Sequence, residues 1–225
     1  MTTIDRTWRA GMAVLGCTLG LALAPAAFAH EGKPHANPQK EPIAPVQGAA
    51  AEKGTRDARS YFTDLELLTQ DGRKVRFYSD VLAGQTVLIN VIYTNCKDAC
   101  PLITQKLNEV RTMVGAQFGR DVRFVTLTSD PERDTPAVLK TFAQKQSADM
   151  GGWMFLTGDK KHIDHILKKL GQFSQNVEDH STLLIAGNVP AKRWSKIRPD
   201  APPMAIAERL RQLSGTAGVT TPLPQ

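Results

Sequence analysis

Two cysteines separated by three residues are the side chains in this chain best suited to chemistry. Cys96 and Cys100 stand in the segment Tyr93-Thr94-Asn95-Cys96-Lys97-Asp98-Ala99-Cys100-Pro101. Two thiols at this spacing can form a disulfide, bind a soft metal ion or do both in turn, and thiolates favour Cu(I). The spacing alone therefore leaves a redox pair and a metal site both open.

A histidine is the obvious third ligand, because imidazole is compatible with copper bound by thiolates. His180 lies in a polar loop, Val177-Glu178-Asp179-His180-Ser181-Thr182, that enters a predicted strand. Such a loop residue is more often a surface turn residue than part of a site. His162 and His165 lie among lysines on a predicted helix, where we interpret them as exposed side chains without a third ligand nearby.

The elements on either side of the cysteines define where the pair sits. Thr86–Ile92 is a short, β-branched apolar run that predicts a strand covered on both faces. Pro101 is tolerated in the first turn of a helix, which we expect to end near Gly119. Cys100 then lies at a helix N-terminus, where free N–H groups and the helix dipole favour a thiolate.

A β-hairpin is predicted ahead of this strand, in a domain that begins near Ser60. Phe62–Leu68 and Val75–Tyr78 show partial alternation of apolar residues. The residues between them, Gln70-Asp71-Gly72-Arg73, have the composition of a hairpin turn.

The next strand is predicted at residues 121–128, parallel to the first because a helix connects them. A polar loop follows, Ser129-Asp130-Pro131-Glu132-Arg133-Asp134-Thr135-Pro136. Thr135 is the expected N-cap of a helix that has Pro136 in its first position and runs to about Gln146. This arrangement brings the loop to the same edge of the sheet as the cysteines.

The remaining pattern completes an α/β domain. We predict a strand at Trp153–Thr157, a helix at Asp159–Leu170, strands at Ser181–Ala186 and Lys192–Ile197, and a closing helix at Pro202–Leu213. The order of these elements is that of a thioredoxin-like sandwich, in which helices cover both faces of a central mixed sheet.

Three motifs in this order resemble the Sco (SenC) family of copper proteins. They are Cys96-Lys97-Asp98-Ala99-Cys100-Pro101, Asp130-Pro131-Glu132-Arg133-Asp134-Thr135-Pro136 and Asp179-His180-Ser181-Thr182, and the likeness covers about residues 60–213. The resemblance implies a thioredoxin-like fold in which Cys96, Cys100 and His180 bind one copper ion. It also implies that Asp130 lies near the metal, behind the ligands or as a weak axial ligand, while a residue that only caps or turns the loop is an equal alternative. Lys97 replaces the proline usual in the family, and a cation beside Cys96 favours its thiolate.

The function that the resemblance implies is an exported copper chaperone. Its recipient would be a copper protein, by analogy the binuclear copper centre of a cytochrome c oxidase subunit, and a thiol reductant protein would keep the pair reduced. The alternative is a thiol–disulfide oxidoreductase with Cys96 and Cys100 as its catalytic pair and Cys96 as the more plausible attacking thiol. A copper sensor is a third class, which the sequence does not separate from a chaperone.

Residues 1–29 are interpreted as a secretory signal peptide, which predicts a location in the bacterial periplasm. Arg6 and Arg9 precede an apolar run, and Ala27-Phe28-Ala29 matches a cleavage site. The alternatives are an uncleaved N-terminal membrane anchor and a lipoprotein attached at Cys17. Cleavage would remove Cys17 and leave Cys96 and Cys100 as the cysteines of the exported protein.

The composition of the ends and the net charge complete the prediction. Residues 30–59 are predicted to be a flexible linker and residues 214–225 a disordered tail, because both contain few large apolar residues. The formal net charge is +6, but the sequence has no run of basic residues interleaved with aromatic residues, so a nucleic-acid partner is not expected. The charge is compatible with an ordinary solvated surface, with acidic partners or with proximity to an anionic membrane.

Overall fold

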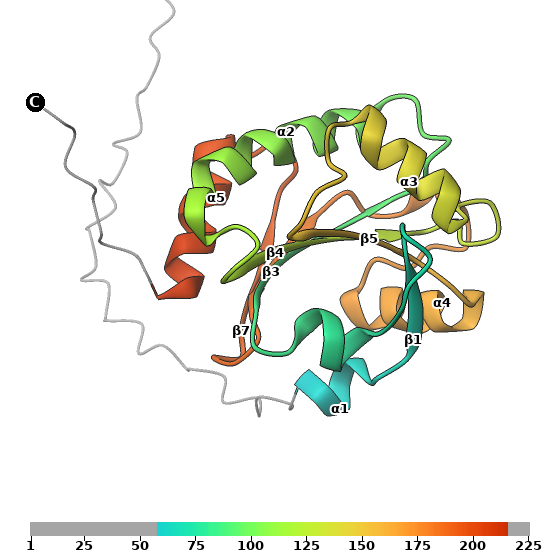
Figure 1. Ribbon diagram of the computed structural model, residues 1–225, viewed down its shortest axis with the longest axis horizontal. Coiled ribbons are helices and arrows are strands. Elements are labelled where there is room, and N and C mark those ends of the chain that lie inside the picture. Colours follow the sequence, from blue (N-terminus) through green and yellow to red (C-terminus); the bar gives the residue numbers. More distant parts are fainter. Residues whose placement is uncertain (1–57, 216–225) are drawn as a thin grey trace, which may run out of the picture. The chain divides into compact units, whose positions relative to one another are not determined.

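A seven-stranded mixed sheet organises residues 58–215, which are the residues that the computed structural model describes (Figure 1). The strand order is β2-β1-β5-β4-β3-β6-β7. The elements are α1 (Ala58–Phe62), β1 (Glu66–Thr69), β2 (Lys74–Arg76), a π-helix (Phe77–Leu82), β3 (Thr86–Ile92), α2 (Ala99–Val114), a 3₁₀ turn (Gly115–Gln117), β4 (Val122–Thr128), α3 (Pro136–Lys145), β5 (Trp153–Thr157), α4 (Lys160–Leu170), a second 3₁₀ turn (Val177–Asp179), β6 (Leu184–Asn188), β7 (Arg193–Ile197) and α5 (Pro203–Ser214).

Strand β3 lies near the middle of the sheet, as its apolar sequence predicts. It pairs in parallel with β4 and antiparallel with β6, and all seven of its residues are buried. Its side chains alternate between two hydrophobic clusters, with Leu88 and Ile92 on one face and Val87, Ile89 and Val91 on the other. The strand therefore contributes to both cores and ends at the loop that carries Cys96.

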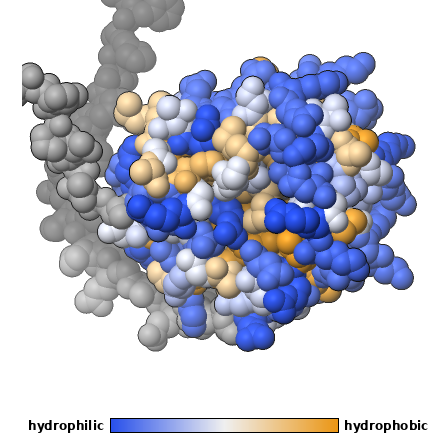
Figure 2. Space-filling model, in the orientation of Figure 1, coloured by the Kyte–Doolittle hydropathy of each residue, from blue (hydrophilic) through white to orange (hydrophobic). Residues whose placement is uncertain are grey.

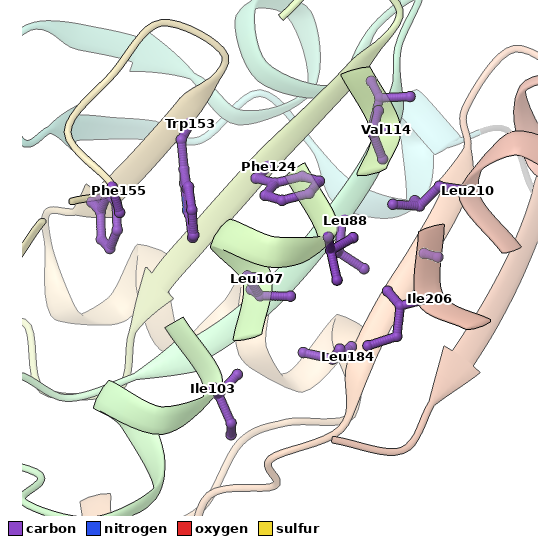
Figure 3. Close-up of a cluster of buried hydrophobic side chains, with 14 of the residues drawn as sticks. Leu88, Ile103, Leu107, Val114, Phe124, Trp153, Phe155, Leu184, Ile206 and Leu210 are labelled. Carbon is purple, nitrogen blue, oxygen red and sulfur yellow. The ribbon is translucent and has the colours of Figure 1, made fainter. Parts of the chain in front are cut away.

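Helices cover both faces of the sheet, so the predicted thioredoxin-like sandwich is confirmed. Helices α2, α3 and α5 lie on one face, and α1 and α4 lie on the other (Figure 1). Figure 3 shows the first core, in which Trp153 and Phe124 from the strands meet Leu107 of α2 and Ile206 of α5. Since α2 packs against the sheet along most of its length, its N-terminal turn is held in place beside the end of β3.

The predicted N-terminal hairpin is present but shorter than expected. β1 and β2 pair antiparallel, and Gly72 occupies the turn at a φ of 73°. Phe62 and Phe77, which we expected in the strands, instead end α1 and begin the π-helix. Both rings are buried, and they contact each other at 5.9 Å between centroids. Burial of the two rings against each other outweighs the local alternation of apolar residues that predicted strands.

Two element boundaries also differ from the prediction. Helix α2 ends at Val114 rather than near Gly119, because Gly115 adopts a positive φ of 64° and a 3₁₀ turn follows. Strand β6 begins at Leu184 rather than at residue 181. By contrast, α3 begins as predicted, with Thr135 as the N-cap whose side chain accepts a hydrogen bond from the Val138 N–H.

The face of the molecule drawn in Figure 2 is mostly hydrophilic, with smaller hydrophobic areas between the polar ones. Within residues 58–215, no helix is both long and apolar enough to span a bilayer. The predicted signal peptide and almost all of the predicted linker and tail lie outside the described residues. Four large apolar side chains are exposed in the described part: Leu102, Met113, Val138 and Met204.

Candidate metal and thiol site

The two cysteines lie together at the junction of β3 and α2. β3 ends at Ile92 and α2 begins at Ala99, so Cys96 lies in the connecting loop and Cys100 in the first helical turn. Cys100 is 1% exposed, whereas Cys96 is half-buried. Both thiols are free, and the backbone N–H of Cys100 donates a hydrogen bond to the Cys96 sulfur at 3.4 Å. The helix N-terminus therefore acts on Cys96 rather than on the cysteine within the helix.

Burial raises the pKa of Cys100 to about 12. A hydrogen bond from the backbone of Tyr93 opposes this rise, while the thiol of Cys96 and the charge of Asp134 add to it. We expected the helix N-terminus to favour a Cys100 thiolate, and this expectation is wrong because desolvation in the core is the larger effect. Cys100 is thus suited to remain a protonated thiol until a metal ion or a disulfide partner replaces its proton.

The pKa of Cys96 is lowered, although its partial burial acts in the opposite direction. Hydrogen bonds from the Cys100 N–H and thiol, the Asp98 N–H and the Tyr93 side chain together outweigh that burial. Lys97 is exposed and is not among these main contributors, so the lower pKa has a different origin from the one the sequence suggested. The more accessible thiol is also the better nucleophile and the readier metal ligand.

Tyr93 contacts both the Cys96 thiol and the predicted histidine ligand. Its side chain hydrogen-bonds to Cys96, and its ring meets the ring of His180 edge-on, with 5.7 Å between centroids. Burial, followed by the neighbouring Cys96, raises the pKa of Tyr93 to about 12, so the phenol stays protonated. A protonated phenol can donate its hydrogen bond to the Cys96 sulfur.

His180 is 8% exposed and packs against the end of β3, which places it near the cysteine loop. Its Nδ1 lies 2.7 Å from the carbonyl oxygen of Val177, and its Nε2 lies 3.2 Å from that of Val91. A neutral imidazole carries only one N–H, and the shorter contact assigns this proton to Nδ1. Nε2 then has the free lone pair that a metal ligand requires, but that lone pair points at the Val91 carbonyl.

The three predicted ligands do not form a ready-made metal cluster in the described structure. Among residues 58–215, no three His, Cys, Asp or Glu side chains are gathered closely enough to hold an ion. The thiols are adjacent to each other, and the His180 ring packs edge-on against Tyr93, whose side chain hydrogen-bonds to Cys96. Binding one ion by all three residues therefore requires the His180 ring to turn Nε2 away from Val91.

Asp130 forms an ion pair with Arg133. Its Oδ2 accepts a hydrogen bond from Arg133 Nη1 at 3.0 Å, and its backbone N–H donates to Thr128 Oγ1. The carboxylate is buried, whereas the Arg133 side chain is 77% exposed. The proximity of Asp130 to a bound metal thus remains a prediction from resemblance.

Asp134 is the site residue that the sequence analysis missed. Its carboxylate is 1% exposed and accepts hydrogen bonds from the backbone N–H and hydroxyl of Thr94 and from the hydroxyl of Thr128. Thr94 stands two residues before Cys96, so Asp134 ties the cysteine loop to the end of β4. Burial raises the pKa of Asp134, and these hydrogen bonds oppose the rise. Asp134 belongs to the same polar motif as Asp130, but only the tertiary structure shows which aspartate meets the loop.

Two further histidines of the described residues, His162 and His165, lie away from this site. They lie on α4, which packs on the opposite face of the sheet from α2. His162 Nδ1 lies 2.9 Å from the Glu66 carbonyl oxygen, and the buried Nε2 of His165 has no hydrogen-bond partner in the described structure. Both side chains are half-buried rather than exposed as predicted, and their position on α4 separates them from the thiols.

The fold and the paired free thiols define a thioredoxin-like dithiol protein whose cysteines follow the central strand. The SCO1/SenC family model matches residues 53–214, and the chain belongs to that family.

Known members of the family match part of this chain. A protein of Bacillus subtilis named as a SCO1 protein homolog is 37% identical over 89 residues, which is 40% of this chain and 45% of that protein. The structure of Bradyrhizobium japonicum ScoI with copper bound is 25% identical, with a TM-score of 0.55 over 66% of this chain and 96% of ScoI. BsSco, described as a Sco family cytochrome c oxidase assembly protein with a disulfide switch, is 26% identical, with a TM-score of 0.59 over 68% of this chain and 93% of BsSco.

Proposed function

We propose that this protein is an exported copper chaperone that binds one copper ion through Cys96, Cys100 and His180 and passes it to another copper protein. The observation that carries the proposal is the pair of free, adjacent thiols at the start of α2, with His180 packed against the same end of β3. Two thiols and an imidazole are a ligand set suited to copper. The copper bound by ScoI of Bradyrhizobium japonicum supports this choice of cargo.

Loading is expected to be gated by redox state and by the position of His180. Copper binding needs reduced thiols, and it releases the proton of Cys100, whose pKa burial raises to about 12. The third bond forms when Nε2 of His180 leaves the Val91 carbonyl, 3.2 Å away. Because Nε2 cannot bind a metal while it faces the Val91 carbonyl, the same movement in reverse would release the ion to a recipient.

The recipient we propose is the binuclear copper centre of a cytochrome c oxidase subunit, and the location is the bacterial periplasm. The description of BsSco as a cytochrome c oxidase assembly protein supports the recipient. The predicted signal peptide at residues 1–29 supports the location. Sequencing the N-terminus of the exported protein tests the location: a start at His30 is expected, whereas a start at Cys17 or Met1 would show a lipoprotein or an anchor.

The test of the ligand assignment is a titration of the reduced protein with Cu(I) against a chromophoric chelator. Wild type should bind one ion per chain, and His180→Ala should weaken binding at least about tenfold, because an inner ligand is lost. His162→Ala, a histidine of α4 outside the site, is the matched control and should bind like wild type. Unchanged binding by His180→Ala would show that the histidine is not a ligand.

A thiol–disulfide oxidoreductase is the second candidate, and the unequal thiols favour it. The half-buried Cys96 has a lowered pKa, as an attacking thiol needs, and Cys100 is placed to resolve the mixed disulfide. The disulfide switch described for BsSco is compatible with it. If reduced wild type binds no copper but rapidly reduces a disulfide substrate, this activity replaces the copper proposal.

A further inference from the structure

A groove runs from the cysteine loop along the space between α2 and α3. It has a volume of about 450 Å³ and is lined by side chains of the loop and of both helices: Thr94, Cys96, Pro101, Ala137, Val138, Thr141, Phe142, Lys145 and Gln146. The two helices lie side by side on the same face of the sheet (Figure 1). A volume of this size accommodates several side chains of a bound segment.

The groove has an apolar wall and one closed end. Pro101, Ala137 and Phe142 provide apolar surface, and so does Val138, which is 39% exposed. At the far end Gln146 joins the two helices, because its backbone carbonyl oxygen accepts a hydrogen bond from Asn108 Nδ2 at 2.7 Å. A segment in the groove therefore meets the Cys96 thiol at one end and this bridge at the other.

Lys145 is the one charged residue among those that line the groove. It is exposed, and no ion pair within residues 58–215 involves it. The N-terminal turns of α2 and α3 both lie at the cysteine end, where their dipoles favour a thiolate, so at the far end the positive charge is that of Lys145 in the last turn of α3. The charge of the groove is thus complementary to an acidic occupant.

We infer that this groove docks an extended segment of the partner protein, with an apolar side chain against Pro101 and Phe142 and a carboxylate at Lys145. This inference rests on the proposed function, since the partner's own cysteine would then lie against Cys96. From Ala137 to Lys145 the helix rises about 12 Å, which an extended peptide covers in about four residues. The segment has its acidic residue about four positions from its cysteine.

The test uses synthetic peptides that carry a cysteine as its mixed disulfide with thionitrobenzoate, with a leucine two positions away. The residue four positions from the cysteine is either glutamate or lysine. Each peptide is made in two versions, one with the cysteine at the N-terminal end and one with it at the C-terminal end, because the direction of the bound segment is not fixed. The Cys96 thiolate attacks the peptide sulfur. The bond to thionitrobenzoate breaks, a disulfide between Cys96 and the peptide forms, and the coloured thiolate leaves.

In one chain direction, the glutamate peptide should react about threefold or more faster than the lysine peptide with the reduced full-length protein, as expected for an exposed ion pair. Lys145→Glu should reverse this preference. Lys161→Glu, an equal change of charge on α4, should preserve it. Circular dichroism confirms that both variants are folded.

Equal rates for the two peptides in both directions would overturn the inference. A preference for the glutamate peptide that survives Lys145→Glu would overturn it too. If Lys161→Glu abolishes this preference as fully as Lys145→Glu does, the effect is one of net charge only, and the inference is likewise overturned. The assay contains no copper, so its result is independent of the Cu(I) titration that decides the proposed function.

Discussion

Asp134→Asn tests how the cysteine loop is held in position. The carboxylate of Asp134 accepts hydrogen bonds from the Thr94 N–H, at 3.1 and 3.3 Å to its two oxygens, and from the hydroxyls of Thr94 and Thr128. An asparagine side chain has only one acceptor oxygen, and its amide group adds two donors. A hydroxyl that meets the new amide group must then turn to accept rather than donate, so at least one of the three donors loses its acceptor.

The size of the effect follows from the burial of Asp134, which is 1% exposed, so water does not replace a lost bond. A hydrogen bond to a charged group contributes about 1.5–3 kcal/mol. Because burial of the carboxylate offsets part of this gain, as its raised pKa shows, we expect Asp134→Asn to lower the free energy of unfolding by about 2 kcal/mol. Asp134→Ala removes every acceptor and should cost about 3–5 kcal/mol.

Urea denaturation followed by circular dichroism measures these losses. Asp130→Asn is the matched control from the same loop, because its ion-pair partner Arg133 is 77% exposed and the pair contributes at most about 1 kcal/mol. The reasoning is refuted if Asp134→Asn is as stable as wild type, or if Asp130→Asn costs as much as Asp134→Asn.

The raised pKa of Asp134 also predicts a pH dependence. Since the folded state holds this proton more tightly than the unfolded state, lowering the pH through the folded pKa stabilises wild type through this group. Asp134→Asn lacks that contribution. The stability difference in favour of wild type should therefore grow as the solution is acidified from neutral pH, and a difference that shrinks would contradict the assignment.

Two further predictions concern the thiols and the sheet. Cys96 should be alkylated by iodoacetamide at least about tenfold faster than Cys100, because the pKa of Cys96 is lowered and its thiol is accessible, whereas burial raises the pKa of Cys100 to about 12. Peptide mapping by mass spectrometry measures both rates. Equal rates would contradict the difference between the two thiol environments. Gly187→Ala should lower the free energy of unfolding by about 1–3 kcal/mol, because its new Cβ would overlap the Trp194 ring. An unchanged urea midpoint would show that Trp194 moves aside at no cost.

The sequence alone was sufficient to predict the sheet, most helices and the location of the cysteine pair. Strand β3 and helix α3 could be predicted because their signals are local: a short β-branched apolar run, and an N-cap threonine followed by a proline. The position of Cys100 at a helix start followed from Pro101 in the same way. The family could be predicted too, since its three motifs are readable in the chain.

The tertiary structure decided what surrounds each of these residues. Desolvation makes Cys100 the high-pKa thiol in spite of its helix position, and Asp134, rather than Asp130, holds the cysteine loop. The His180 ring faces the Val91 carbonyl and packs edge-on against Tyr93, and both contacts join segments that are distant in sequence. Burial and contacts between distant segments set pKa values and hydrogen-bond partners, and neither is encoded in the spacing of residues along the chain.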